Sequence, residues 1–242
     1  MAKQYLVCLD PGHGPETANA SPDGTFLERE FTWDMCQRLS RALVGQGIAV
    51  ILTRTWDVKP SLTQRAEVSN AAGADLFLSI HSNAAGNSGW SAPQGVLIYT
   101  SAPGPEAPRN IAARDILEQL RLAGVGIWGS GLAHEAFTVL VKTAAPALLM
   151  ECGFHTNREE VEWLKDPAYR ELLAGATTRG ICQFFGIPYV EPVPDLPQPA
   201  PWAARAWERA VELGILDGTA PQGTVSREML AVVLDRIGAL GP

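Results

Sequence analysis

The segment ADLFLSIHSNA, residues 74–84, carries the clearest indication of the fold. An almost unbroken apolar run, LFLSI at 76–80, leads directly into His81 and two further polar residues. This pattern predicts a buried parallel strand that ends where the polar residues begin. Because ligands of open α/β sheets bind at the carboxyl ends of strands, His81 is a candidate site residue. A histidine that is simply hydrogen-bonded at the rim of a sheet would look the same in sequence.

Five further apolar runs predict strands, and they alternate with longer segments of helical period. The strands are expected at 5–9, 48–53, 95–99, 137–141 and 147–151, and the helices at 28–46, 61–72, 105–123 and 167–185. Such alternation is typical of a parallel sheet covered by helices. We therefore predict an α/β fold with a mainly parallel, twisted sheet of about six strands flanked by helices, plus a small C-terminal helical module.

The amino-acid composition of the chain changes after residue 187. The segment IPYVEPVPDLPQPAP, residues 187–201, is dense in proline, which removes backbone donors and favours an extended spacer. Two short segments of helical period follow it, and the second begins at Ser226, a residue suited to cap a helix. We predict a domain at 1–187, a linker at 188–201 and a helical module at 202–242. A module this small rarely buries enough apolar area alone, so we expect it to associate with the main domain, a second copy or a surface.

Composition excludes several classes of protein. The chain has 242 residues and a net charge of −7, without a run of Lys or Arg, which argues against nucleic-acid binding. No apolar stretch approaches the roughly 20 residues that a membrane helix needs, and the amino terminus lacks the shape of a signal peptide. We expect synthesis in the cytoplasm. The four cysteines show no CxxC spacing and are expected to be reduced, buried thiols.

A second histidine is expected at the same sheet edge as His81. The first predicted strand runs into LDPGHG, residues 9–14, where proline and glycine force a turn that places His13 beyond the strand end. Two histidines supply two of the three protein ligands that a catalytic zinc ion needs. They also fit an iron site formed by two histidines and a carboxylate.

The next helix offers two carboxylates, and its period distinguishes them. Phe31, Met35 and Leu39 mark the inward stripe, and Glu28 lies on it, whereas Glu30 falls on the polar face. A buried carboxylate needs a partner, which a metal would supply. The alternative is a carboxylate that only stabilises the positive end of the helix dipole.

A third carboxylate, Glu151, ends the apolar run ALLME. Burial at a strand end raises the pKa of a carboxyl group, which suits a general base. Strand alternation directs Cys152 to the opposite face, so a cysteine nucleophile paired with His155 is a weak rival. His134 lacks the second histidine of a zinc-binding helix and is expected to be structural.

Taken in order, DPGHG, the inward Glu28, SIHSNA and ME-x-GF-x-TN resemble the zinc-dependent N-acetylmuramoyl-L-alanine amidases of the type-3 amidase family. The resemblance covers about residues 4 to 186 and includes LTR at 52–54 and L-x-x-R ending at Arg65. Two departures stand out: PETANASPDGTFLERE, residues 15–30, replaces the family's usual loop, and Arg29 replaces a common lysine. The tail resembles, less specifically, part of a surface-layer-homology module.

The resemblance implies a function and a ligand set. His13, Glu28 and His81 would bind Zn²⁺, and Glu151 would take the proton of a zinc-activated water that attacks the amide between N-acetylmuramic acid and L-alanine. Asn83 is a candidate to hydrogen-bond the substrate, or else to cap the strand end. The expected partner is peptidoglycan, with wall contact or self-association through 202–242.

Two alternatives for the function, and the place where the protein acts, stay open. The same metal site would serve another zinc amide hydrolase, such as a carboxypeptidase, and the fold would also serve a non-catalytic wall-binding protein. A wall hydrolase without a signal peptide is expected to act after release, in phage lysis as an endolysin or in lysis of a sporulating cell.

Overall fold

The computed structural model describes residues 3–17, 19–86, 89–191, 199–200, 202–216 and 225–236. The chain separates into two compact units, Met1–Val190 and Glu191–Pro242. Most of the predicted linker, 188–201, lies outside the described residues, as does most of the turn between the two predicted C-terminal helices. None of the helices in the described part of the chain combines the length and apolar character that a bilayer crossing requires.

The first unit is built on a six-stranded sheet with strand order β2-β1-β3-β6-β4-β5. The strands are β1 (Leu6–Pro11), β2 (Ala49–Leu52), β3 (Leu76–Asn83), β4 (Val96–Thr100), β5 (Ile127–His134) and β6 (Ala147–Phe154). All neighbouring pairs are parallel except β4 with β6. The predicted α/β fold with a mainly parallel sheet is therefore confirmed.

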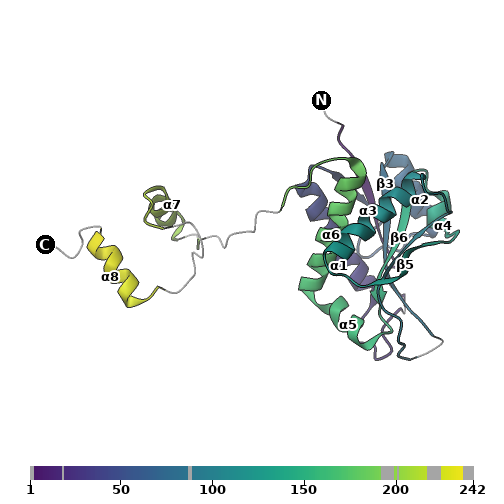
Figure 1. The fold of residues 1–242 in the computed structure, drawn as a ribbon, viewed down its shortest axis with the longest axis horizontal. Coiled ribbons are helices and arrows are strands. Elements are labelled where there is room, and N and C mark those ends of the chain that lie inside the picture. Colours follow the sequence, from purple (N-terminus) through teal and green to yellow (C-terminus); the bar gives the residue numbers. More distant parts are fainter. Residues whose placement is uncertain are drawn as a thin grey trace. The chain divides into compact units, whose positions relative to one another are not determined.

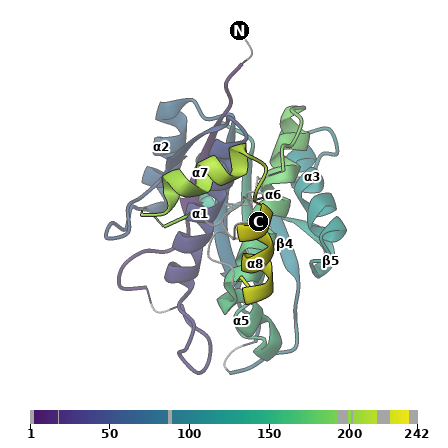
Figure 2. The ribbon, with the colours of Figure 1, turned by 90° about the vertical axis from the view of Figure 1, so that its left-hand side faces the viewer.

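Helices cover both faces of this sheet (Figure 1). They are α1 (Glu28–Gly45), α2 (Leu62–Ala72), α3 (Pro108–Leu122), α4 (Thr138–Lys142), α5 (Arg158–Lys165) and α6 (Pro167–Phe185). Helices α1, α6 and α3 lie side by side over one face (Figure 2), and α2 and α4 cover part of the other. The larger apolar core lies under the first group, and a smaller cluster around Phe77 and Leu149 lies under the second.

The four predicted helices of this unit form within three residues of their expected ends, but three other segments differ from prediction, one of them the unpredicted helix α5. The strand predicted at 137–141 is wrong: residues 138–141 form most of α4, which buries Val139 and Leu140 against the sheet. One of the two edge strands of the sheet, β5, was not predicted. It contains Gly129 and Gly131, both with positive φ, and exposes residues 128–130, so it lacks the alternation that marks a strand.

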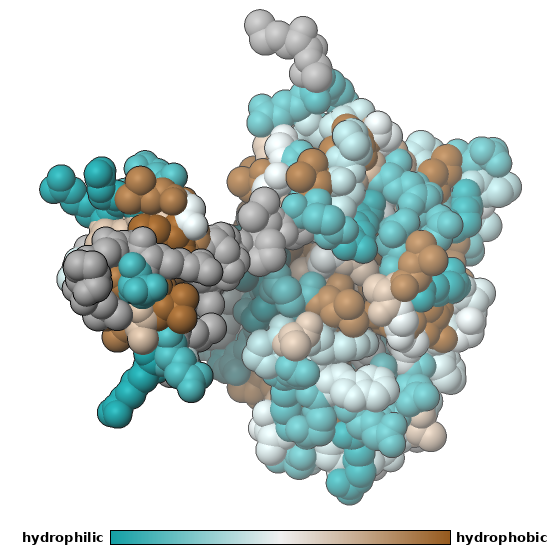
Figure 3. All heavy atoms as spheres, turned by 60° about the vertical axis from the view of Figure 1, so that its left-hand side comes forward, coloured by the Kyte–Doolittle hydropathy of each residue, from teal (hydrophilic) through white to brown (hydrophobic). Residues whose placement is uncertain are grey.

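All four cysteines are buried and unpaired, as expected of reduced thiols. The second unit contains α7 (Ala204–Glu212) and α8 (Arg227–Arg236). Several of its large apolar side chains lie at the surface (Figure 3), including Trp202 with 90% of its area exposed. No residue of α7 is buried.

Candidate metal centre and active site

The turn after β1 brings His13 to the carboxyl edge of the sheet. Gly12 is required there, because a Cβ at this position would lie 2.6 Å from the carbonyl oxygen of Ile80 and against the ring of His81. His13 itself adopts a positive φ of 60°, a conformation that is costly for a residue with a side chain. Arg65 stabilises this turn by donating hydrogen bonds to the carbonyl oxygens of Pro11 and His13.

A buried ion pair anchors the turn to the sheet. Arg65 lies 2.7 Å from Asp10, and both side chains are almost fully buried. Asp10 also accepts hydrogen bonds from the hydroxyls of Thr53 and Ser79 at 2.5 and 2.6 Å. Both oxygens of the Asp10 carboxylate therefore have hydrogen-bond partners, which a charged group removed from water requires.

Glu28 is the first residue of α1 and lies between the two histidines. Its Oε2 is 2.9 Å from His13 Nε2, and its Oε1 is 3.1 Å from His81 Nδ1. The residue is 1% exposed, whereas Glu30 is exposed, so the two carboxylates are divided as the helical stripe predicts. The backbone N–H of Ser82 donates to Oε1 at 2.9 Å and the amide of Asn19 donates to Oε2 at 3.0 Å, which fixes the carboxylate in place.

This arrangement shifts the pKa values of Glu28 and His81. Burial disfavours the charged form of Glu28, but hydrogen bonds with His13 and His81 outweigh it, and the pKa of Glu28 is held well below its usual range. Burial likewise disfavours the charged form of His81, yet the hydrogen bond to Glu28 and the charge of Glu151 raise its pKa. The site therefore keeps Glu28 negatively charged and attracts positive charge.

One ligand atom from each of His13, Glu28 and His81 lies within 4.8 Å of the others, so the three side chains could hold a metal ion. The two imidazole rings are 5.0 Å apart, edge to face. Two imidazole nitrogens and one carboxylate oxygen match the donor set of catalytic zinc sites. The donor chemistry of these residues thus fits the metal that the sequence resemblance implies.

Glu151 lies across from His81, its partner in the register of β3 and β6. Its Oε2 is buried and has no hydrogen-bond partner among the described residues. Burial, reinforced by the negative charge of Glu28 and opposed by His81, raises the pKa of Glu151 to about 7. A carboxyl group with such a pKa can exchange a proton near neutral pH.

Comparison with known proteins identifies the family. The sequence profile of the N-acetylmuramoyl-L-alanine amidases matches residues 7–183, which is most of the chain. The chain belongs to the N-acetylmuramoyl-L-alanine amidase family. The resemblance read from the sequence is confirmed to that extent.

Individual amidases agree with this assignment. The amidase CwlM of Bacillus licheniformis is 37% identical over 183 residues, which cover 75% of this chain and 69% of CwlM. The endolysin of Bacillus phage SPP1 is 31% identical over 75% of this chain and 66% of its own length. The crystal structure of an amidase from Clostridium difficile 630 superposes with a TM-score of 0.70 at 28% identity, covering 76% of this chain and 98% of that one.

Two other candidates from the amidase sequence have local partners. Asn83, predicted to contact substrate, accepts a hydrogen bond from the N–H of Ala84 through its side-chain oxygen at 2.8 Å. His155 is buried, and its Nδ1 lies 2.9 Å from the hydroxyl of Ser82, while burial lowers its pKa. The position of His155 fits a structural role behind the candidate metal ligands.

Sequence reasoning missed several residues that shape the amidase site. Asn19 lies in the loop that departs from the family pattern, yet it contacts both Glu28 and His13. Ser82 contributes through its backbone N–H, which no side-chain pattern reveals. Asp10 and Arg65 could have been suspected, since opposite charges in two apolar elements need each other.

Proposed function

We propose that this protein hydrolyses the amide bond between N-acetylmuramic acid and the L-alanine of the peptidoglycan stem peptide, with Zn²⁺ held by His13, Glu28 and His81. Membership of the amidase family supports the reaction class. The observation that carries the proposal is the three-ligand group beside a buried carboxylate without a hydrogen-bond partner, Glu151. A protein that only bound cell walls would have no use for that carboxylate.

Bound Zn²⁺ supplies Lewis acidity, which makes water nucleophilic near neutral pH and polarises the scissile carbonyl. The chain's own residues complete the chemistry. Glu151 accepts a proton from the attacking water and returns it to the leaving amine of L-alanine, a transfer that its raised pKa permits. Glu28 stays ionised, because Ser82 and Asn19 donate to it as well as the histidines.

Asn83 is proposed to orient the substrate. Its side-chain oxygen is used by Ala84, whereas its amide N–H groups have no partner among the described residues and are free to donate to a carbonyl of the substrate. The residue lies in β3 two positions beyond His81.

The proposed metal and its role are tested together by metal analysis and a wall-clearing assay. Protein loaded with zinc should contain one ion per chain and clear purified cell walls, and a chelator should abolish both properties. Readdition of zinc should restore them. Clearing that continues after the metal content has fallen to zero would overturn the proposal.

For the second unit we propose attachment to wall material or to a second copy, with the cell wall as the place of action. Exposed apolar side chains in and next to α7 and α8 support this role, among them Trp202, Leu213, Leu230 and Val232. A chain that stops after Pro188 should bind sedimented walls less well than the full chain. Equal binding by the two chains, together with a monomeric full chain, would rule out both roles.

A further inference from the structure

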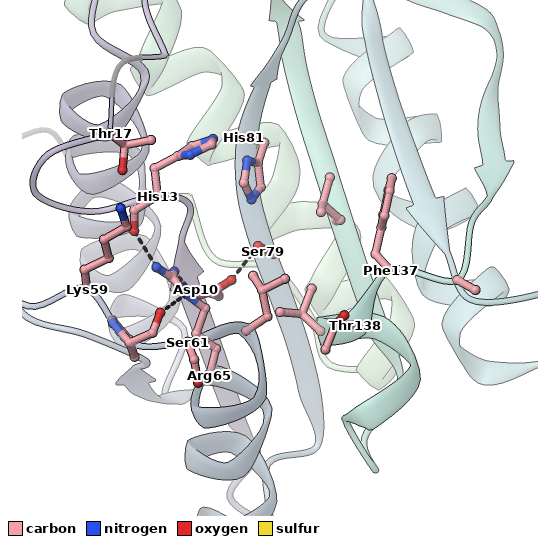
Figure 4. A pocket seen from close by; sticks show the side chains of 15 residues that line it. Asp10, His13, Thr17, Lys59, Ser61, Arg65, Ser79, His81, Phe137 and Thr138 are labelled. Atoms are coloured by element: carbon pink, nitrogen blue, oxygen red, sulfur yellow. Dashed lines mark hydrogen bonds and ion pairs between the residues drawn. The ribbon is translucent and has the colours of Figure 1, made fainter.

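A pocket of about 520 Å³ opens beside the candidate metal ligands (Figure 4). His13 and His81 lie at one end, and the sheet forms the floor through Asp10, Ser79 and Leu149. The remaining walls come from the segment that leads into α2, from α2 itself and from the start of α4. This volume lies within the range of pockets that bind small ligands.

The charged groups of the pocket are all paired except one. Asp10 and Arg65 neutralise each other, as described above. Lys59 lines the pocket, and its ammonium group has no hydrogen-bond or ion-pair partner among the described residues. The other three lysines each have one: Lys3 bonds Asp75, Lys142 bonds Thr63 and Lys165 bonds Glu162. A lone cation facing a pocket, in a chain of net charge −7, favours an anionic ligand.

The position of Lys59 is set by the turn that carries His13. Its stem packs on Gly14, where a Cβ would lie 3.0 Å from the Cβ of Lys59. In Figure 4 the amine points toward the side of the pocket where Thr17 and His13 lie. The hydroxyl of Thr17 is buried there and lacks a hydrogen-bond partner within the described part of the chain. The unpaired ammonium group of Lys59, which is exposed, and the buried hydroxyl of Thr17 thus lie on the same side of the pocket, next to the proposed reaction centre.

The shape of the substrate decides which part of it this pocket receives. Peptidoglycan presents a glycan strand that continues in both directions and a stem peptide that ends after a few residues. A recess between α2, α4 and the sheet admits a chain that ends, whereas a continuing polymer needs an open groove. The apolar wall, formed by Leu62, Phe137 and Val139, suits the aliphatic part of a peptide.

We propose that this pocket receives the stem peptide and that Lys59 binds a free carboxylate of that peptide. The enzyme therefore selects stem peptides that carry a carboxylate near L-alanine over peptides in which that group is a carboxamide. This inference rests on the proposed function, because it assigns the peptide side of the same substrate. A charge-assisted hydrogen bond at a partly exposed site gives a preference of about tenfold.

The test compares three soluble substrates: N-acetylmuramoyl-L-alanyl-isoglutamate and the two compounds that carry a carboxamide in place of one of its carboxylates. Each of the two carboxyl groups is amidated in turn, which shows which one Lys59 recognises. The protein should show a kcat/KM about tenfold higher for the free carboxylate, and Lys59→Met should bring this ratio close to one. Lys59→Arg should keep the ratio. Lys142→Met, which removes a charge next to α2 but outside the pocket, is the matched control.

A binding measurement separates this inference from the proposed function. Calorimetry with L-alanyl-isoglutamate and its carboxamide needs no turnover, so it reports on the pocket alone. Binding that depends on Lys59 without hydrolysis of any substrate would uphold the pocket assignment and overturn the proposed function. Hydrolysis with the same ratio for the Lys59→Met and unmodified proteins would uphold the function and overturn the role of Lys59. An equal loss of kcat/KM on the carboxylate and carboxamide substrates in Lys59→Met would also overturn the role of Lys59.

Discussion

Glu151 in β6 is paired with His81 in the neighbouring strand β3, so a buried carboxylate that can exchange a proton is held beside a candidate metal ligand. Neither strand alone carries this relationship. It arises from parallel pairing of two strands that are 70 residues apart in the chain, in which the register sets His81 directly opposite Glu151. The proposed chemistry depends on that register.

The first prediction concerns Glu151→Gln. This change keeps the shape of the side chain but removes its ability to accept a proton, so we expect wall hydrolysis to fall by roughly 10²–10⁴. Zinc content should stay at one ion per chain, because Glu151 is not one of the three ligands. Parallel activity and metal measurements check this. A variant that loses its zinc, or one that keeps its activity, would show that Glu151 has a different role.

The pH dependence of hydrolysis is the second prediction. A general base must be deprotonated, so kcat/KM should rise with pH through the pKa of Glu151. That pKa is about 7 without a cation, and a metal ion at the neighbouring ligands favours the charged form and lowers it. The acidic limb should therefore have its midpoint below 7. A rate that does not fall on acidification, while the protein stays folded and loaded with metal, would contradict this.

A third prediction uses the two carboxylates at the start of α1 as a matched pair. Glu28→Gln should weaken zinc binding by at least 10- to 100-fold, since it removes the charge that the site is built around. Glu30→Gln, two residues away on the exposed face, should leave zinc affinity unchanged. Competition with a chromogenic chelator measures both. Similar affinities for the two variants would remove Glu28 from the ligand set.

The fourth prediction concerns stability. Arg65→Met leaves Asp10 buried without its cationic partner, which should lower the free energy of unfolding by about 3–5 kcal/mol. Arg38→Met breaks the more exposed pairs with Asp34 and Glu171 and should cost about 1 kcal/mol or less. Urea denaturation compares the two directly. Equal losses would mean that the Asp10–Arg65 pair is no more important than a surface contact.

Much of this architecture could be predicted from the sequence, because apolar runs and helical periods record burial directly. The stripe of α1 separated Glu28 from Glu30 for the same reason. The segment 137–141 was wrongly predicted as a strand, because an apolar run of five residues fits a buried helix as well as a buried strand. Strand β5 is held by its pairing with β4, and its own residues carry no strand pattern.

The site itself was only partly predictable. His13 follows the apolar strand β1, and His81 and Glu151 end apolar runs, which marked all three as candidates, although β3 and β6 continue past them to Asn83 and Phe154. Asn19 and the N–H of Ser82 reach Glu28 through the three-dimensional course of the loop and strand, which leaves no periodic signal. The unpaired state of Lys59 is equally a tertiary property, since it depends on where the acceptors lie.

A metal-dependent centre that cleaves one particular amide bond leaves a defined set of products, which mass spectrometry can identify. Purified peptidoglycan should be incubated with the zinc-loaded protein, with a chelated sample and the Glu151→Gln variant as controls, and the products identified by mass spectrometry. We expect free stem peptides that begin with L-alanine and intact glycan strands. Neither the chelated sample nor the Glu151→Gln variant should release stem peptides. Cleavage within the stem peptide or the glycan, or release that survives chelation, would contradict the proposed function.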